Sequence, residues 1–555
     1  MSAPERVLRL LLLLDSSSSD APSGTPAGRA KPGSGNGDAD GDIVEQGSEY
    51  EARLLADRRA KRDRVRDELG VNPYGRREDD LLDIADARDR FVEGAEGDDR
   101  AVVKVAGRVM LHRDTGKLQW LNLRDMTGDV QVAVSKRDAV SPEAFEIAKL
   151  ADLGDILVVE GPIMKTRTGE ITVWASHVKM GSKSLALPPE KWSGLQDPEL
   201  RYRRRYIDMY ANPDVTKTLA MRSRIVTAIR QFMADRGYLE VETPMLQVQA
   251  GGAAARPFIT HLNAMEMDLF LRIAPELYLK RLMVGGMHRV FELNRNFRNE
   301  GVDRRHNPEF TSMEVYQAFG NYRTMLELTE DLLRALAMMV SPSGIVPWGE
   351  HELNFAQPFR QVTYAELFEE ANGFPMNDFK RVRDKAAELH LVKAPDLDDW
   401  LVVNVVFEAT AEQGLIQPTF VLDYPSAISP LTRPKEDDPT LCERWDFFIG
   451  EMEIGPAYTE LNDPDVQEQK FREQLRGADL DEQTFRTLDE DFLNALRVGM
   501  PPAGGLGLGI DRIVMLLTNQ RSIRDVIPFP FMRPEQASSG AATPASETDE
   551  EISAS

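Results

Sequence analysis

The fold is decided by residues 289–300, which read RVFELNRNFRNE. Apolar and polar side chains alternate along this stretch, as they do in a β-strand with two unlike faces. One face carries Phe291, Leu293 and Phe297. The opposite face carries a polar series: Glu292, Asn294, Asn296, Arg298 and Glu300. The pattern predicts a strand that packs on a core with one face and presents polar groups with the other.

A second alternating stretch follows a charged turn at residues 301–308. Phe310, Ser312, Glu314 and Tyr316 share one of its faces. The two stretches together predict an antiparallel strand pair whose polar face mixes aromatic rings with isolated charges. A solvated sheet surface would give the same alternation. Bulky aromatic rings beside single charges are more typical of a pocket floor.

Residues 445–462 repeat the alternation, and we expect a hairpin turn at Ile449 and Gly450. Such a turn would set Asp446 directly across from Glu453, at about 5 Å. Two carboxylates that close repel each other unless a cation lies between them. The pair therefore suggests a Mg²⁺ ion that bridges phosphate groups.

Residues 504–512 read GGLGLGIDR. Glycines at this density predict a strand that passes close to another group and then turns into a helix. A glycine run alone is a weak signal for phosphate binding, and Arg512 at its end strengthens it. Upstream, residues 201–236 carry nine Lys or Arg against three Asp, and residues 221–236 have the apolar spacing of a helix.

Five short alternating runs lie between residues 100 and 184, separated by turn signals. They predict a small five-stranded β-barrel of the OB-fold type. Residues 100–140 carry eight Lys or Arg against four Asp. Trp120 lies in this basic stretch near Arg113 and Gln131, and single-stranded nucleic acids are bound by such aromatic, cationic and amide groups. The alternative is that Trp120 belongs to the barrel core.

The charge of the chain is unevenly distributed. The formal net charge is -24 over 555 residues, which taken as uniform would disfavour a nucleic acid partner. Residues 1–48 and 534–555 hold -8 of this charge, and we expect both low-complexity tails to be disordered. Residues 49–99 begin with a charge-dense helix that ends near Leu69. This helix is either solvated and lightly packed or faces RNA.

The composition excludes several classes of protein. Cys442 is the single cysteine, which excludes intramolecular disulfides and Cys-based metal clusters. No apolar run approaches the roughly 20 residues that cross a bilayer. The leucine run at residues 10–14 is too short for a secretion signal and is followed by Asp15. We therefore expect a cytoplasmic protein without a membrane segment.

Together these stretches resemble the three sequence motifs of class II aminoacyl-tRNA synthetases. The first motif is similar to residues 221–244, the second to residues 297–310 and the third to residues 505–512. Four further stretches resemble lysyl-tRNA synthetases within that class: GGAAARPF at 251–258, APELYLK at 274–280, LIQPTF at 415–420 and YTELND at 458–463. The resemblance covers about residues 50–533, which is too long a span for chance.

The resemblance implies an α+β chain of several domains. A five-stranded OB-fold β-barrel would bind the anticodon at residues 100–184, followed by a linker at 185–220. A class II catalytic domain, on a mainly antiparallel sheet with flanking helices, would occupy residues 221–533. The implied enzyme is a homodimer that forms lysyl-adenylate and pyrophosphate from lysine and ATP. It then transfers lysine to the 3′-terminal ribose of tRNA(Lys).

The resemblance also assigns roles to residues. Arg298 and Arg512 would be catalytic. ATP would be held by Arg298, Glu300, His306, Phe310, Asp446, Glu453 and Arg512, with Mg²⁺ on Asp446 and Glu453. Lysine would be held by Gly252, Glu276, Arg298, Glu314, Tyr316, Tyr458 and Glu460. Anticodon bases would contact Arg113, Trp120 and Gln131.

Two positions depart from the family. Asp446 stands where the family usually has Glu, and Pro456 stands where an Asn usually helps to hold the lysine carboxylate. Proline has no side-chain amide and no backbone N–H, so we expect weakened lysine affinity with activity retained. Two other functions stay open: a paralogue that lysylates a protein, which would lack the OB-fold, and a non-catalytic RNA-binding relative, which would have lost residues such as Arg298.

Overall fold

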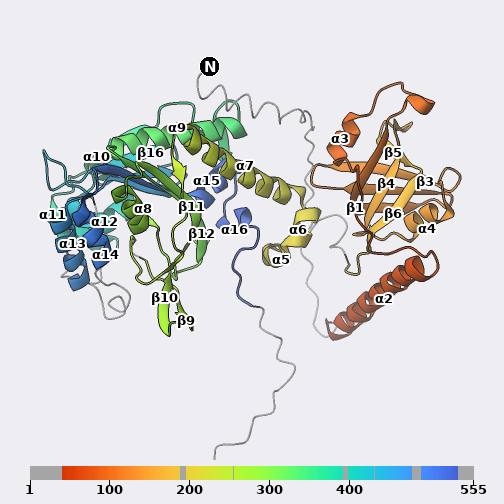
Figure 1. Cartoon of the computed structure of the whole chain (residues 1–555), viewed down its shortest axis with the longest axis horizontal. Coiled ribbons are helices and arrows are strands. Elements are labelled where there is room, and N and C mark those ends of the chain that lie inside the picture. The colour runs from red at the N-terminus through yellow and green to blue at the C-terminus, as the bar shows by residue number, and fades with distance from the viewer. Residues whose placement is uncertain are drawn as a thin grey trace, which may run out of the picture.

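The computed structural model describes residues 40–187, 196–253, 255–391, 398–429, 432–477 and 489–534. Figure 1 shows a β-barrel built from the first part of the chain and a larger sheet covered by helices built from the rest. The α+β class expected from the sequence is confirmed. Among the described residues, no helix combines the length and the apolar character that crossing a membrane requires. The two tails lie largely outside the described residues, although helix α2 begins at Asp40, earlier than expected.

The barrel consists of five strands in the closed order β1-β2-β3-β5-β4, with β4 pairing back to β1. They span Val102–Asp114 (β1), Leu118–Arg124 (β2), Asp129–Ser135 (β3), Ile156–Lys165 (β4) and Ile171–Ala175 (β5). The predicted five-stranded OB-fold is thus confirmed. A sixth strand, His177–Ser182 (β6), pairs antiparallel with β4. Helix Pro142–Leu150 (α4) connects β3 to β4. Alternate residues of each strand fill the core, among them Val105, Leu121 and Val132.

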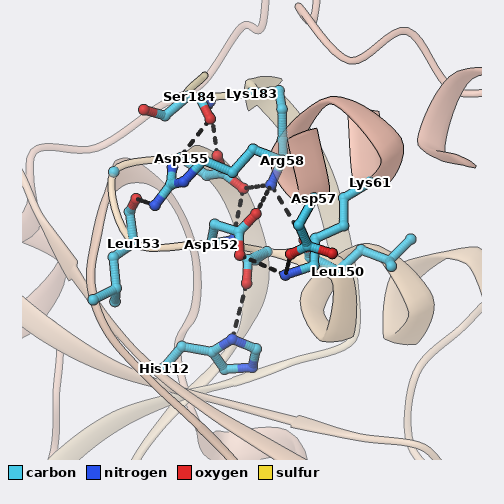
Figure 2. A network of polar contacts seen from close by, with 12 residues as sticks. Asp57, Arg58, Lys61, His112, Leu150, Asp152, Leu153, Asp155, Lys183 and Ser184 are labelled. Carbon is cyan, nitrogen blue, oxygen red and sulfur yellow. Dashed lines mark hydrogen bonds and ion pairs between the residues drawn. The ribbon is translucent and has the colours of Figure 1, made fainter. Parts of the chain in front are cut away.

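Helix α2 (Asp40–Asp67) is fixed to the barrel by a buried polar network, which Figure 2 shows. Arg58 donates hydrogen bonds to the backbone carbonyls of Leu153 and Ser184 at 2.9 and 3.1 Å. Beside it, the ammonium of Lys183 lies 2.6 Å from Asp152 and 2.7 Å from Asp155. Four further basic side chains of the helix lie beside carboxylates: Lys61, Arg62, Arg64 and Arg66. This pairing favours a helix that packs on the barrel over one that offers free cations to RNA.

Helices occupy the described part of residues 185–220, where we expected a linker. They span Pro198–Arg203 (α5) and Arg205–Ala211 (α6) and lead into the long helix Pro213–Asp235 (α7). Arg205 is buried and donates hydrogen bonds to Asp208 and to the backbone carbonyl of Arg524. This bonding ties the segment to the C-terminal part of the catalytic domain.

The catalytic domain is built on an eight-stranded sheet in the order β15-β16-β17-β18-β19-β12-β11-β7. The strands span Arg360–Thr363 (β15), Thr419–Leu422 (β16), Arg444–Ile449 (β17), Met452–Thr459 (β18), Ala503–Gly509 (β19), Glu309–Ala318 (β12), Arg289–Phe297 (β11) and Leu239–Glu240 (β7). The pairs at the two ends are parallel, and the pairs between them are antiparallel. The predicted mainly antiparallel sheet is confirmed.

The apolar face of this sheet forms the main core. Helices α7, Tyr322–Val340 (α9) and Ile510–Leu517 (α15) pack there on side chains such as Phe291 and Leu293. The opposite face is partly covered by helix Glu276–Val284 (α8), which packs on Tyr316 and Val290. The pocket described below opens on this second face.

The remaining elements surround this framework. The helices are Ile84–Asp89 (α3), Tyr364–Asn372 (α10), Phe379–Glu388 (α11), Asp399–Thr410 (α12), Pro464–Gly477 (α13), Glu490–Gly499 (α14) and Ile523–Val526 (α16), with short 3-10 turns at Gly97–Asp99 and Ser426–Ile428. A three-stranded sheet combines Leu246–Gln247 (β8), Ile259–Leu262 (β9) and Met267–Leu271 (β10), and Ile345–Trp348 (β13) pairs with His351–Asn354 (β14).

Candidate active site

A pocket of about 460 Å³ lies over strands β11, β12, β18 and β19. In the register of β11 and β12, Asn296 pairs with Phe310, Asn294 with Ser312 and Glu292 with Glu314. These polar-face residues therefore share one side of the sheet, as the alternation predicted. The pocket is lined by Asn296, Arg298, Phe310, Ser312, Glu314 and Tyr316. The interpretation as a pocket floor is thus supported over that of a solvated surface.

Two arginines, Arg298 and Arg512, line the pocket. Arg298 follows the last residue of β11, and its guanidinium carbon lies 5.1 Å from the centre of the Phe310 ring. Its Nε is buried and meets no hydrogen-bond partner within the described chain. Arg512 stands in the first turn of α15 and donates hydrogen bonds to the Glu453 carbonyl and to Nε2 of His306. A buried cation with an unused donor, such as Arg298, suits an anionic ligand.

The glycines of β19 allow close approach at two points that shape the pocket. A methyl group on Gly455 of β18 would collide with the backbone of Gly507 on β19, so the two strands meet without side chains there. A methyl group on Gly505 would collide with the Glu460 carboxylate and the Tyr316 ring. The predicted close passage of this strand is therefore confirmed.

Three carboxylates gather at one end of the pocket. Glu276 and Glu314 line it, and Glu460 lies directly behind, against Gly505. Tyr316 donates a hydrogen bond to Glu314 at 3.3 Å. The ammonium of Lys280, also behind the wall, is 2.6 Å from Glu276 and 2.5 Å from Glu460. Gly252, in a left-handed conformation with φ of 85°, leaves space beside Glu276.

The pKa values of Glu314 and Glu460 are raised. Burial, and then the Glu276 charge, raises the pKa of Glu314 to about 8. Burial raises the pKa of Glu460 to about 7, against the lowering effect of Lys280. Tyr458, which lines the same wall, has a pKa raised by burial. Carboxylates resist ionisation where positive charge is scarce, so this end of the pocket favours a cationic ligand.

The expected pairing of Asp446 with Glu453 is wrong. The turn falls at Gly450 and Glu451, whose φ angles of 60° and 61° allow a tight two-residue connection. This turn sets Glu453 opposite Phe448, and a β-bulge beyond that pair shifts the register by one further residue, so that Asp446 faces Pro456. The sequence pattern contained no signal for the bulge, and a bulge moves every later partner by one residue.

The two carboxylates nevertheless lie close enough to influence each other. Burial, and then the Asp446 charge, raises the pKa of Glu453, which lines the pocket. Asp446 lies behind the lining and is held by Arg444 at 2.6 and 2.8 Å. Within the described residues, no three His, Cys, Asp or Glu side chains gather in the way that a fully protein-bound metal requires. A hard cation fits Glu453 here if a bound anion supplies further oxygens.

The remaining predicted nucleotide residues also line the pocket. Glu300 and His306 come from the turn between β11 and β12. His306 is oriented by Asp303, whose carboxylate is 2.9 Å from Nδ1. Of the thirteen pocket residues expected from the sequence, Asp446 and Glu460 lie just behind the wall, and the others line the pocket.

The barrel carries the three residues expected to bind anticodon bases on one outer surface. Trp120 pairs with Arg113 across β1 and β2, and Gln131 lies on the same side of the neighbouring strand β3. Trp120 is half-buried and does not belong to the barrel core. Its ring meets Trp174 edge to face, with centroids 6.4 Å apart. The interpretation of Trp120 as core is therefore excluded.

Sequence reasoning assigned no role to Lys280 or to Trp174. Lys280 follows Glu276 by four residues, the spacing at which helical side chains meet, and this signal was available in the sequence. Trp174 occupies an outward position of the predicted strand at residues 171–174. The alternation that placed Trp120 outward therefore applies to Trp174 as well.

Comparison with known proteins agrees with this arrangement. The family model of class II tRNA synthetases (D, K and N) matches residues 197–533, and that of the OB-fold nucleic acid binding domain matches residues 103–180. A lysine–tRNA ligase of Pelotomaculum thermopropionicum is 47% identical over 503 residues, which cover 89% of this chain and 98% of the relative.

Two further relatives carry the same name. The lysine–tRNA ligase of Carboxydothermus hydrogenoformans is 45% identical, over 84% of this chain and 95% of its own length. That of Cronobacter sakazakii is 47% identical, over 78% of this chain and 86% of its own length. With the OB-fold barrel and the class II sheet both present, the chain belongs to the lysine–tRNA ligase family of class II tRNA synthetases.

Proposed function

We propose that this chain activates L-lysine with ATP to form lysyl-adenylate and pyrophosphate, and then transfers lysine to the 3′-terminal ribose of tRNA(Lys). The observation that carries the proposal is the division of charge within one pocket. One end holds the carboxylates of Glu276, Glu314 and Glu460, and the other holds the guanidinium groups of Arg298 and Arg512. A dicationic amino acid and a polyanionic nucleotide match these two ends.

Activation needs no covalent enzyme intermediate. The lysine carboxylate attacks the α-phosphorus of ATP, and negative charge builds on the phosphorus oxygens. Arg298, with its unused Nε, holds the α-phosphate and the lysine carboxylate together, and Arg512 adds a second positive charge. Catalysis is then mainly positioning and neutralisation of charge.

The adenine is assigned to the turn between β11 and β12. Phe310 stacks on the base, with Arg512 on its other face, and Glu300 and His306 contact its edge. The position of all four residues along one pocket supports this assignment.

The lysine side chain is assigned to the acidic end. Glu276 and Gly252 take the α-ammonium, and Tyr316, Tyr458, Glu314 and Glu460 surround the ε-ammonium. A site with buried carboxylates rejects uncharged analogues strongly, because those carboxylates would be left unpaired. The raised pKa values of Glu314 and Glu460 support the assignment of a cationic ligand to this end of the pocket.

Magnesium is assigned to Glu453, with Asp446 behind it. The ion would neutralise the ATP phosphates and orient the pyrophosphate leaving group. Arg444 already balances Asp446 at 2.6 Å, so Glu453 is the direct ligand that this arrangement favours.

The barrel surface with Arg113, Trp120 and Gln131 is assigned to the anticodon. Trp174 adds a second ring to this surface. Unpaired anticodon bases stack on aromatic side chains, and amide and guanidinium groups read their edges. Such a role belongs in the cytoplasm, where translation takes place.

A homodimer is assigned to residues 221–244 and the neighbouring three-stranded sheet. Large apolar side chains are exposed there: Leu239, Leu246, Val248, Ile259 and Met265. Exposed apolar side chains at this density favour a protein partner, and a second copy is the one proposed.

Two measurements test the proposed function on the full chain. Lysine-dependent exchange of pyrophosphate into ATP measures activation, and charging of purified tRNA(Lys) measures transfer. Both are expected, and Arg298→Ala should lower the exchange rate by about 10²-fold or more. Exchange without charging would indicate a paralogue that lysylates another acceptor, and loss of both would indicate a non-catalytic relative.

A further inference from the structure

Lys280 is a buried cation that belongs to the wall of the lysine pocket. Its side chain is 1% exposed, and its ammonium lies 2.6 Å from Glu276 and 2.5 Å from Glu460. It stands in α8, one helical turn after Glu276. Burial by itself lowers the pKa of Lys280, but the charges of Glu276 and Glu460 outweigh burial and raise it. The side chain is therefore a permanent cation behind the pocket.

The carboxylate of Glu460 is held on both sides. One oxygen lies against Gly505 and the Tyr316 ring, where no side chain larger than hydrogen fits on β19. The other oxygen receives the ammonium of Lys280. Without Lys280, this second oxygen would be left without its partner, and Glu460 would lose the contact that fixes it. Lys280 thus positions an acid that substrate lysine is proposed to meet.

The charges that face this cluster can be counted element by element. Helix α8 contributes Glu276 and Lys280, strand β12 contributes Glu314 and the Tyr316 phenol, and the end of β18 leads to Glu460. Arg298 approaches from β11. The nearby Glu292 is already neutralised by Arg272 at 2.6 Å, with both side chains 1% exposed. Three carboxylates and one resident ammonium remain at the acidic end.

We propose that Lys280 sets the charge count of the lysine site, so that the three carboxylates offer two uncompensated negative charges for the two ammonium groups of lysine. Arg298 then remains for the lysine carboxylate. Lys280 is a positioning residue in this scheme, because it acts through Glu276 and Glu460 without contacting the substrate. The inference rests on the proposed function.

The charge of Lys280, unlike the size of its side chain, should make lysine binding depend on pH. A neighbouring cation favours ionised carboxylates, and substrate lysine needs them ionised. Removal of that cation would raise the pKa of Glu460 further, because Lys280 lowers it, so that protons compete more strongly with lysine. The defect should therefore be large near pH 6.5 and shrink towards pH 9.

The experiment compares Lys280→Met with Lys280→Arg by lysine-dependent pyrophosphate exchange between pH 6.5 and 9. Methionine keeps the unbranched side chain up to the position of Cε and removes the charged ammonium. For Lys280→Met we expect a lysine KM raised at least tenfold at pH 6.5, less at pH 9, with the ATP KM within about twofold of wild type. For Lys280→Arg the charge is kept, so the pH dependence of the lysine KM should remain that of wild type even where the larger group raises KM throughout.

A matched control comes from the barrel. Lys183 is equally buried between two carboxylates, Asp152 and Asp155, and it is not among the residues that line the 460 Å³ pocket. Lys183→Met should lower the melting temperature and leave the lysine KM and its pH dependence as in wild type.

Two results would overturn the inference while the wild type remains active. One is an unchanged lysine KM in Lys280→Met, and the other is a defect of equal size at every pH, which indicates loss of packing alone. Absence of lysine-dependent exchange in the wild type would instead contradict the proposed function. A circular dichroism melt of Lys280→Met shows whether the variant is folded. Proton release on lysine binding to the folded variant, compared with wild type, tests the effect of the Lys280 charge independently of turnover.

Discussion

Two buried lysines, each between two carboxylates, lie in different parts of the molecule and differ in what surrounds them. In the barrel, Lys183 has a side chain with 0% exposure between Asp152 and Asp155 (Figure 2). Lys61 also reaches Asp152, so the two acids meet two ammonium groups. In the catalytic domain, Lys280 forms ion pairs with both Glu276 and Glu460. A third carboxylate, Glu314, lies close enough to Glu276 for that charge to raise its pKa.

The comparison separates a completed ion cluster from an incomplete one. A cluster whose charges balance only stabilises a fold, and even that contribution is offset by the cost of desolvation. A cluster that lacks positive charge and adjoins a 460 Å³ pocket is ready for a cationic ligand. Burial, and then the Glu276 charge, raises the pKa of Glu314 to about 8, so this acid retains a proton at neutral pH.

The largest expected effect concerns the completed cluster. Lys183→Met leaves Asp155, whose side chain is fully buried, without its cation. Breaking a buried ion pair in this way costs about 3–5 kcal/mol of folding free energy. Urea denaturation followed by the fluorescence of Trp120 and Trp174 should report the loss. An unchanged denaturation midpoint would show that the cluster contributes nothing to barrel stability.

The second effect concerns the incomplete cluster. Glu460→Gln removes one negative charge and leaves Lys280 with a single carboxylate, so kcat/KM for lysine should fall by about 10²-fold or more. The matched variant Asp155→Asn in the barrel should lower thermal stability and keep the lysine kinetics. Pyrophosphate exchange at varied lysine concentration measures both. Equal losses of kcat/KM in Glu460→Gln and Asp155→Asn would contradict the proposal that only the cluster in the catalytic domain binds lysine.

The third effect is a proton count. Because Glu314 and Glu460 have pKa values of about 8 and about 7, the free site holds protons at pH 7 that bound ammonium groups displace. Lysine binding should then release about one proton at pH 7, so lysine affinity rises by up to about tenfold per pH unit between pH 6 and 8. Calorimetry in two buffers of different ionisation enthalpy measures the release. Proton uptake, or none, would contradict the raised pKa values.

The same raised pKa values predict how the stability of the ligand-free enzyme depends on pH. The folded-state pKa of Glu314 lies above its ordinary value of 4.5, so the folded protein binds a proton that the unfolded chain has already lost. The contribution of Glu314 to stability is therefore greatest at low pH and declines as pH rises from about 4.5 to 8. Saturating lysine should reduce this decline, because it neutralises the ionised acid.

Much of this site followed from the sequence because strand alternation is a local property. The register of β11 and β12 placed Asn296, Phe310 and Glu314 on one face, as two alternating stretches and an antiparallel turn require. Trp120 pointed outward for the same reason. Assignments of this kind need only the two-residue alternation of side chains along a strand.

The features that the sequence did not predict depend on contacts between distant segments. The hairpin turn lies one residue later than expected, at Gly450 and Glu451, and a bulge between β17 and β18 shifts the register by one residue more, so that Asp446 does not face Glu453. The alternation of residues 445–462 predicted neither the turn position nor the bulge. The basic residues of α2 suggested an RNA surface, yet Arg58 and Lys61 meet partners about a hundred residues away in the barrel. The spacing of Glu276 and Lys280 indicated their contact, but the second contact of Lys280, with Glu460 far along the chain, had no local signal.

The smallest expected effect tests whether the incomplete cluster also lacks an anchor for the substrate carboxylate. Pro456 lines the pocket opposite Asp446 and has neither a side-chain amide nor a backbone N–H. Pro456→Asn supplies an amide in the pocket that Arg298 also lines, and one hydrogen bond of about 0.5–1.5 kcal/mol should lower the lysine KM by roughly two- to tenfold. The ATP KM should not change, since the amide would face the amino acid. A lysine KM equal to or above that of the wild type would show that Arg298 alone suffices for the carboxylate, and the shortage in this site would then be one of positive charge only.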